Sequence, residues 1–210
     1  IDKKEVARQT TAFFFEKPKN FKFIPGQFIE MHLNNKIYSF SIASSPKEKE
    51  LMITTRMRPS NFKNYLKKVK IGGRVKIDGP FGQFILHKNK KIPAVFLAGG
   101  IGITPFRSMI KNYPNRKIIL FHSNRKSEDA AFLNELKELE NKNKNFKLVS
   151  IMTGLTGHIN PKMIKENIKD WRKTIYYAVG STGFVQSMAN LLSEMKIKPE
   201  NIKTENFSGY

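Results

Sequence analysis

The chain of 210 residues is 40% hydrophobic and 26% charged, a globular composition that excludes disordered, collagen-like and low-complexity classes. It has no cysteine, which excludes disulfides, thiolate nucleophiles and cysteine-ligated metal clusters, and no apolar run approaches the ~20 residues of a membrane-spanning helix. The 38 Lys and Arg residues outnumber the 17 Asp and Glu residues, and the resulting net charge of +21 favours acidic partners or phosphorylated ligands.

The first 90 residues predict short strands separated by turns. Runs of β-branched and aromatic residues predict strands at 10–16, 27–33, 38–43, 51–56 and 74–77. One helix interrupts these strands, with Ser60 as its N-cap and Phe62, Leu66 and Val69 at helical spacing. Many short strands with a single helix predict a small antiparallel β-barrel.

The remaining residues predict alternating strands and helices. Continuous apolar runs predict strands at 94–97, 117–121, 146–151 and 174–179, and helices are expected at 105–111, 128–141, 161–167 and 184–195. This alternation implies an α/β domain with a doubly wound parallel sheet. The charged stretch 88–91 is suited to a linker, so we expect a barrel domain over 1–90 and an α/β domain over 91–210.

The first strand of the second half ends in a glycine-rich turn, Gly99-Gly100-Ile101-Gly102, which leads into a helix near Pro105. Exposed amides at such a turn can bind an anion, and a pyrophosphate is the natural guest. A tight structural turn explains the glycines equally well. The spacing also departs from the dinucleotide fingerprint, because Thr104 stands at its last glycine position.

Two other strand ends carry polar residues. The run Ser123-Asn124-Arg125-Lys126 follows the second strand and suits a ribose or its 2′-phosphate, with a solvated basic loop as the alternative. Gly180 and Ser181 follow the fourth strand and open a helix. Because the carboxyl ends of parallel strands meet at one edge, the three turns together predict a binding crevice there.

The segment 38–46 alternates aromatic and hydroxyl residues along a predicted strand. Alternate side chains share a face, which puts the apolar set opposite the small polar set: Tyr38, Phe40 and Ile42 against Ser39, Ser41 and Ala43. A barrel core accounts for the apolar face. The run of hydroxyls is suited to hydrogen-bonding a heteroaromatic ring.

With these motifs in this order, the chain resembles the ferredoxin–NADP reductase superfamily of flavoproteins over nearly its whole length. The resemblance rests on the segments 26–27, 40–46, 79–84, 99–108 and 205–210. It implies a stand-alone oxidoreductase, without a fused iron–sulfur domain, that holds FAD in preference to FMN. The flavin would lie in the cleft between the domains and take a hydride from NAD(P)H through its N5 atom.

The resemblance also implies roles for residues of the first half. Phe40 would pack by the flavin, and Ser41 would hydrogen-bond flavin N5 as a catalytic residue. The family's arginine, which grips the flavin pyrophosphate, falls on Tyr38, and Lys36 or Arg56 can supply the lost charge. The helix start would bind phosphate through the amides of residues 61–63. The remaining expected flavin contacts are Ser39, Ile42, Thr54, Thr55, Ser60, Asn61, Phe62 and Lys63, the last of which can also be an ordinary exposed lysine.

In the second half the resemblance assigns a nicotinamide-binding site. Its expected members are Gly99, Gly100, Gly102, Thr104, Pro105, Ser123, Asn124, Arg125, Gly180 and Ser181. Val179 stands where many relatives carry cysteine. Glu205 would be a second catalytic residue that positions nicotinamide or relays protons. Phe207 would cover the flavin, unless it is a core residue, and Tyr210 is an alternative cover. No metal site is expected.

The expected co-substrate, partner and location follow from charge. Ser123, Arg125 and Lys126 favour NADP(H), although relatives that use NAD can also have Arg there. An acidic electron carrier such as ferredoxin or flavodoxin would suit the positive charge, and nucleic acid is not expected because the lysines form no dense block. No secretory signal is visible, so a cytoplasmic location is expected. The alternatives are an electron-transfer subunit of a larger redox complex and a flavin-free basic module that binds phosphate or nucleic acid.

Overall fold

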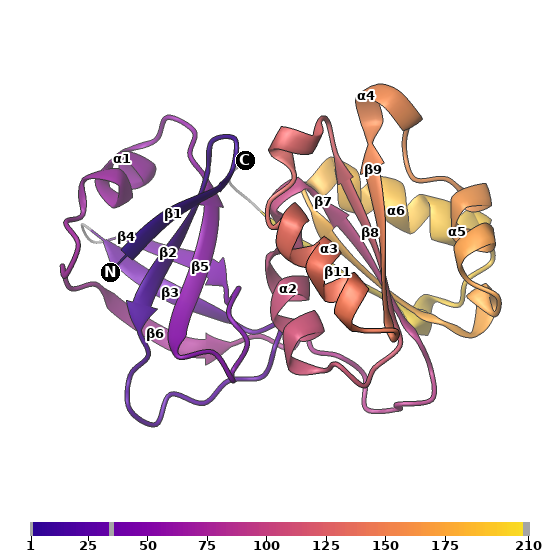
Figure 1. Ribbon diagram of the computed structural model, residues 1–210, viewed down its shortest axis with the longest axis horizontal. Coiled ribbons are helices and arrows are strands. Elements are labelled where there is room, and N and C mark those ends of the chain that lie inside the picture. The colour runs from indigo at the N-terminus through magenta and orange to yellow at the C-terminus, as the bar shows by residue number, and fades with distance from the viewer. Residues whose placement is uncertain (1, 34–35, 208–210) are drawn as a thin grey trace. The chain divides into compact units, whose positions relative to one another are not determined.

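The computed structural model describes residues 2–33 and 36–207 of the chain (Figure 1). Its contacts define two compact units: residues 1–85 with 104–112, called here the N-terminal unit, and residues 86–103 with 113–210, the C-terminal unit. Helix α2 (Ile103–Asn112) follows the first strand of the C-terminal unit, yet nearly all of it groups with the N-terminal unit. We keep 1–90 and 91–210 as a proposal for the domain limits along the sequence.

The N-terminal unit contains two three-stranded antiparallel sheets. One has the order β1-β2-β5 and consists of β1 (Asp2–Ala7), β2 (Thr10–Glu16) and β5 (Glu50–Arg56). The other has the order β4-β3-β6 and consists of β4 (Lys36–Ser41), β3 (Phe28–Leu33) and β6 (Lys76–Phe81). The five predicted strands are confirmed, β2 with the predicted ends and the other four with shifted ends, and β1 is an addition.

The backbone changes partner strand directly after β4, which joins the two sheets. Ser41 is the last residue of β4 and pairs with Phe28 of β3. Two residues later, the Ala43 amide donates to the carbonyl of Met52 in β5 at 2.8 Å. The predicted strand 38–43 therefore begins and ends two residues too late, since β4 spans Lys36–Ser41. The prediction of a barrel-like antiparallel fold is confirmed.

Helix α1 (Asn61–Lys68) packs on the apolar interior of the N-terminal unit. Its N-cap is Ser60, as predicted, whose hydroxyl accepts a hydrogen bond from the Lys63 amide at 3.1 Å. Phe62 and Leu66, four positions apart, face the same core as Ile53 of β5. Burial of side chains of this size stabilises the unit by about 1.5–3 kcal/mol each.

The C-terminal unit is built on one parallel sheet of five strands in the order β11-β10-β7-β8-β9. Its strands are β7 (Ala94–Gly99), β8 (Ile118–Asn124), β9 (Phe146–Met152), β10 (Ile175–Gly180) and β11 (Ile202–Asn206). The four predicted strands are confirmed, and β11 is an addition at the edge. The doubly wound parallel sheet predicted from the sequence is therefore correct.

Helices cover both faces of this sheet, and Figure 1 shows α3 (Leu133–Lys142) on the face opposite to α6 (Thr182–Glu194). Helix α5 (Pro161–Asn167) and helix α6 contribute side chains to one hydrophobic core. Alternate residues of the central strands point into the same core. The predicted helix at 128–141 is interrupted, because a 3₁₀ turn at Ser127–Asp129 precedes α3 and Phe132 adopts a left-handed conformation at φ 62°.

The strand order reverses at β7, in the middle of the sheet. From β7 the chain proceeds to β8 on one side, and from β9 it returns to β10 on the other side. The carboxyl ends of β7 and β10 therefore form the switch point at which open α/β sheets bind ligands.

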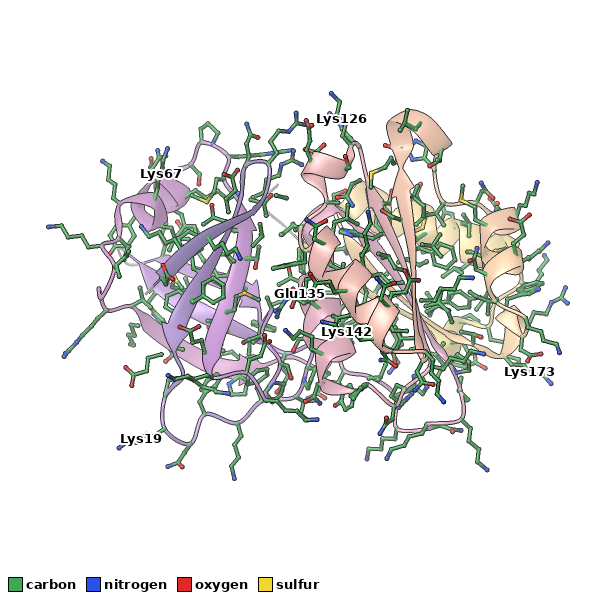
Figure 2. All side chains as sticks on the ribbon, in the orientation of Figure 1. Lys19, Lys67, Lys126, Glu135, Lys142 and Lys173 are labelled. Carbon is green, nitrogen blue, oxygen red and sulfur yellow. The ribbon has the colours of Figure 1, made fainter. Side chains whose placement is uncertain are left out.

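Lysines occur on both units, without a dense block. Figure 2 shows Lys19 and Lys67 on the N-terminal unit, and Lys126 and Lys173 on the C-terminal unit. Among the described residues, no helix has the length and apolar character needed to cross a membrane.

Candidate functional site

The predicted site residues fall into two clusters, and each is described by itself. The N-terminal site comprises the end of β4, the end of β5 and the start of α1, that is, residues 38–42, 54–58 and 60–63. The C-terminal site comprises the carboxyl ends of the parallel strands, that is, residues 99–102, 122–125, 179–181 and 205–207. Thr104 and Pro105 belong to neither cluster, because they lie buried in α2, which groups with the N-terminal unit.

In the N-terminal site three aromatic rings stack. The centroid of the Phe62 ring lies 3.9 Å from the centroid of the Tyr38 ring and 5.3 Å from that of the Phe40 ring. The interplanar angle is 25° in both pairs. Tyr38, Phe40 and Ile42 contribute to one apolar cluster, which agrees with the predicted shared face. The Tyr38 ring, at the position of the family's arginine, is thus engaged in aromatic packing.

Two hydroxyl groups of this site lack a partner within the part of the chain that is described. Ser41 is only 8% exposed, and its hydroxyl forms no hydrogen bond there. The Oγ1 atom of Thr54, in a residue 5% exposed, also has no partner. A buried polar atom without a partner, such as Thr54 Oγ1, costs about 1–3 kcal/mol, so a bound polar ligand that pairs with it would stabilise the site.

Cations gather at the start of α1. The pKa of Lys63 is lowered, first by burial and then by repulsion from Arg58 and Arg56. Such a concentration of positive charge is suited to an anion such as a pyrophosphate. The expectation that all three amides at 61–63 are open to phosphate is wrong, because Ser60 Oγ occupies the Lys63 amide. Lys36, the other proposed source of charge, is exposed at the start of β4.

Arg58 is a member of this site that the sequence motifs did not identify, although Arg56 and Arg58 stand two apart directly before the cap Ser60. Arg58 lines a groove of about 410 Å³ beside α1. The groove is lined by Glu5, Gln9, Thr11, Met57, Arg58, Pro59, Lys63, Asn64 and Lys67. Three of these side chains are cationic and one is acidic, so the groove can hold an elongated anionic ligand.

The C-terminal site collects at one edge of the parallel sheet, as predicted. In the strand register Gly99 lies opposite Ser123, and Gly180 lies opposite Asn206. Asn124, the last residue of β8, lies opposite Met152 of β9. The polar and glycine-rich turns after β7, β8 and β10 therefore share the carboxyl edge.

The glycines of the turn after β7 serve different purposes. A Cβ on Gly102 would come within 2.2 Å of the Val179 carbonyl oxygen, so this glycine is needed for close packing against β10. The absence of a Cβ on Gly99 and on Gly180 leaves room for the Phe184 ring. Gly100 has a φ of +55° and open space beside it, and it is the glycine of this turn that suits an approaching ligand.

Two buried polar residues of β8 support this edge. His122 is fully buried, and its Nε2 lies 3.2 Å from the Gly100 carbonyl oxygen. Burial lowers the His122 pKa to about 4, so the ring is neutral and donates through Nε2. Asn124 is 6% exposed, and neither atom of its amide has a partner among the described residues. An amide held in this way is suited to a ligand at the end of β8.

The tail of the chain reaches the same edge through β11. Glu205 lies opposite Val179 in the parallel register, and the Phe207 amide donates to the Gly180 carbonyl at 2.9 Å. The structure adds β11, which the sequence did not predict, and places Glu205 and Phe207 at the end of this strand. Tyr210, the alternative aromatic cover, lies outside the described residues.

A turn that we did not predict as part of the site follows β9. Helix α4 (Thr153–Thr156) is a single turn in which Leu155 is 88% exposed. The Gly154 amide donates to the Arg125 carbonyl at 3.4 Å, so this turn lies beside the loop that follows β8. The signal available in the sequence was a pair of Thr-Gly steps directly after a predicted strand.

Comparison with known proteins identifies two domain types in the chain. Residues 1–85 match the oxidoreductase FAD-binding domain, and residues 96–190 match the oxidoreductase NAD-binding domain. A flavohemoprotein of Oceanobacillus iheyensis is 26% identical over 99% of this chain. One component of the Na⁺-translocating NADH-quinone reductase of Mannheimia succiniciproducens is 26% identical over 82% of this chain. The chain spans 57% of the first relative and 49% of the second.

Solved structures share the fold over nearly the whole chain. The cytochrome P450 reductase GcoB of Amycolatopsis superposes with a TM-score of 0.86 at 20% identity, covering 99% of this chain and 68% of that protein. The ferredoxin-NADP⁺ reductase of Plasmodium falciparum gives a TM-score of 0.83 at 17% identity, covering 99% of this chain and 94% of that protein.

Proposed function

Because the chain belongs to the ferredoxin–NADP reductase superfamily, as an FAD- and NAD-binding oxidoreductase, we propose that it takes a hydride from NAD(P)H onto bound FAD and passes the electrons to an acidic electron carrier such as ferredoxin or flavodoxin. A bound flavin supplies the ability to accept a hydride and to release its electrons singly. The protein supplies position, charge and exclusion of water.

The N-terminal site is suited to hold FAD. Arg56, Arg58 and Lys63 would bind the pyrophosphate, and the groove beside α1, with three cationic side chains in its lining, would take the adenosine end. Phe40 would pack against the ring system, and the hydroxyl of Ser41 would donate to flavin N5. This assignment is supported by Thr54 Oγ1, a buried atom that has no partner among the described residues and that a bound ring would satisfy.

The C-terminal site is suited to hold the nicotinamide dinucleotide. The turn at Gly100 offers open space and backbone amides for the pyrophosphate at the switch point of the sheet. Asn124 would supply a hydrogen bond that its amide does not form within the described residues. Glu205 would orient the nicotinamide carboxamide or hold a proton beside it.

Among the two nicotinamides we propose a preference for NADP(H). Ser123 and Arg125 lie at the end of β8, and Lys126, which Figure 2 shows next to this strand end, adds a second cation. A hydroxyl with two cations is suited to a 2′-phosphate. Replacing Arg125 with Ala should raise the KM for NADPH about tenfold and leave the KM for NADH within twofold, and an equal effect on both would overturn the preference.

The observation that most directly supports the proposed reaction is the position of the Ser41 hydroxyl. It is buried at the end of β4, in the domain that matches FAD-binding oxidoreductases, and has no partner in the described part of the protein. A hydroxyl in this state is free to donate to an atom that gains charge on reduction.

The positive charge supports an acidic carrier as electron acceptor. A net charge of +21 attracts an anionic protein at long range and speeds its association at low salt. The test is the rate of reduction of ferredoxin and flavodoxin by NADPH as a function of salt. A rate that falls steeply between about 50 and about 500 mM salt, by tenfold or more, is expected for electrostatic steering. A rate independent of salt would contradict this choice of acceptor.

A second candidate is an electron-transfer module of a larger redox protein or complex. This candidate is favoured by the relative lengths of the proteins, because the chain spans 57% of the flavohemoprotein and 49% of the quinone-reductase component. In that case NAD(P)H would reduce the flavin, while onward electron transfer would require a partner. Reduction of the flavin without reduction of either soluble carrier would favour this second candidate.

The experiment that tests the reaction itself is anaerobic mixing of the FAD-loaded protein with NADPH or NADH. Loss of the flavin absorbance band is expected, and its rate should fall about tenfold in Ser41→Ala while bound FAD is retained, the loss of about one hydrogen bond to a charged acceptor. Replacement of Ser187, an exposed serine of α6 outside both sites, with Ala is the matched control. An unchanged rate in Ser41→Ala would remove Ser41 from the reaction.

A further inference from the structure

An ion pair that the proposed reaction does not use holds the segment following Ser41. Arg107, in α2, is 5% exposed, and its Nη1 donates to the Ala43 carbonyl at 2.8 Å. The same guanidinium donates to both carboxylate oxygens of Glu48, each at 3.0 Å. One buried arginine therefore hydrogen-bonds both the backbone two residues after Ser41 and the side chain of Glu48 in the following loop.

The next residue of the helix makes a second attachment to the same segment. Ser108 is fully buried, and its hydroxyl donates to the Ser44 carbonyl at 2.6 Å. On the other side, the Ser44 hydroxyl accepts a hydrogen bond from the Met52 amide of β5 at 2.9 Å. The backbone at 43–44 is thus fixed from α2 and from β5 at once.

Two cations, Arg107 and Lys111, pair with the carboxylate of Glu48. Burial raises the pKa of Glu48, but hydrogen bonds and charge from Arg107, with Lys111 and the Ser45 amide, outweigh it and lower the pKa to about 2. Lys111 lies 2.9 Å from the Glu48 carboxylate. Glu48 is therefore ionised near neutral pH, and its charge supports the ion pair with Arg107.

We infer that Arg107 is a positioning residue for hydride transfer, which acts by fixing the Ser41 hydroxyl through the backbone at Ala43 and Ser44. This inference rests on the proposed role of Ser41. Within the described residues no hydrogen bond holds the hydroxyl, so the atoms it can reach depend on where the backbone places the Ser41 Cβ. The backbone after Ser41 is held in turn by Arg107 and Ser108.

Lysine cannot replace Arg107 in this role. The planar guanidinium donates to three acceptors at once: the Ala43 carbonyl and the two oxygens of Glu48. An ammonium can keep the charge pairing with Glu48, but it lacks the fixed fork that reaches the carbonyl at the same time. Arg107→Lys should therefore preserve the charge of the cluster and release the backbone.

The test is a double-mutant cycle with Arg107→Lys, Ser41→Ala and the combined variant, each loaded with FAD. The rate of flavin reduction at saturating NADPH, the dissociation constant for FAD and the unfolding midpoint are measured for each. We expect each single variant to reduce flavin about five- to tenfold more slowly, and the combined variant to be no slower than Ser41→Ala. This lack of additivity is the signature of a residue that acts through Ser41, which a purely structural role would not give.

The outcomes separate the inference from the function on which it rests. A normal rate in Ser41→Ala removes the proposed role of Ser41, and the inference falls with it. A slow Ser41→Ala together with a normal Arg107→Lys overturns the inference alone. So do losses that multiply in the combined variant, because Arg107 then acts independently of Ser41.

Two further variants keep the test decisive. If Arg107→Lys does not retain FAD, Ser108→Ala takes its place in the cycle. This variant removes the hydrogen bond from the Ser108 hydroxyl to the Ser44 carbonyl. Its reduction rate is compared with that of Ser41→Ala and of the combined variant in the same way. Lys111→Gln is the matched control, since Lys111 pairs with the same Glu48 carboxylate at 2.9 Å. It should lower the unfolding midpoint and leave the reduction rate within twofold.

Discussion

His122 donates through Nε2 to the carbonyl oxygen of Gly100 at 3.2 Å, from a ring that is completely buried. The residue therefore fixes the turn in which Gly100 has its open, left-handed conformation. Because burial disfavours the charged ring, protonation of His122 at low pH destabilises the folded protein.

The first prediction concerns the acid sensitivity of the fold. Burial lowers the folded-state pKa of His122 from 6.5 to about 4, so the unfolded chain takes up a proton below pH 6.5 and the folded protein does so only near pH 4. Stability is therefore complete above pH 6.5 and declines as the pH falls towards 4. The expected loss between pH 7 and pH 5 is about 2 kcal/mol from this group.

Urea unfolding at pH 7 and pH 5 measures this effect. His122→Gln should show a loss smaller than that of the wild type by about 2 kcal/mol. His158→Gln, which removes an exposed imidazole, is the control and should follow the wild type. Identical pH dependence in wild type and His122→Gln would contradict the prediction.

The second prediction concerns the packing of Gly102 on β10. A Cβ at this position would meet the Val179 carbonyl oxygen at 2.2 Å, and backbone on both sides must shift to admit it. Gly102→Ala should lower the free energy of unfolding by about 2–3 kcal/mol and weaken nicotinamide binding. Gly183→Ala is the matched control, because nothing lies within 4 Å of its Cβ, and its stability should be equal or higher. A neutral Gly102→Ala would show that the close approach does not matter.

The third prediction concerns Asn124, whose amide forms no hydrogen bond within the described residues. Asn124→Ala should change the free energy of unfolding by less than about 1 kcal/mol, because no intramolecular partner is lost. The KM for the nicotinamide substrate should rise about tenfold while kcat stays within twofold. Steady-state kinetics measure both constants. A large loss of stability with an unchanged KM would assign Asn124 a structural role instead.

The fourth prediction concerns the cations near α1. Arg58→Ala removes one of the charges that repel Lys63, so the protein without flavin should keep its stability, whereas the dissociation constant for FAD should rise about tenfold. The salt dependence of FAD binding should weaken at the same time. Titration of FAD by fluorescence measures both effects. Lys19→Ala, at an exposed lysine outside the groove, is the control, and equal behaviour of the two variants would contradict the assignment.

Elements that bury an apolar pattern could be predicted from the sequence. Strand β2 and helix α5 begin and end at the predicted residues, and Ser60 caps α1 as its hydroxyl and position suggested. Strands β1 and β11 were missed because both carry charged residues and pair along only one edge in their sheets. Their formation depends on a neighbouring strand, which a local pattern does not reveal.

The site could be predicted in part for the same reason. The strand ends that carry glycine or hydroxyl residues are visible in the sequence, and the register brings them to one edge of the sheet. The sequence did not show which contact requires a particular residue at a particular position. Gly102 is required by the carbonyl of Val179, and Tyr38 is engaged by Phe62, contacts that exist only once distant segments have packed.

The most direct test of the account is the visible spectrum of the purified protein with FAD, followed by anaerobic addition of NADPH. We predict a yellow protein with one tightly bound FAD per chain, whose absorbance band disappears on mixing with NADPH. A protein that stays colourless after incubation with FAD, or a bound flavin that NADPH leaves oxidised, would contradict the proposed reaction.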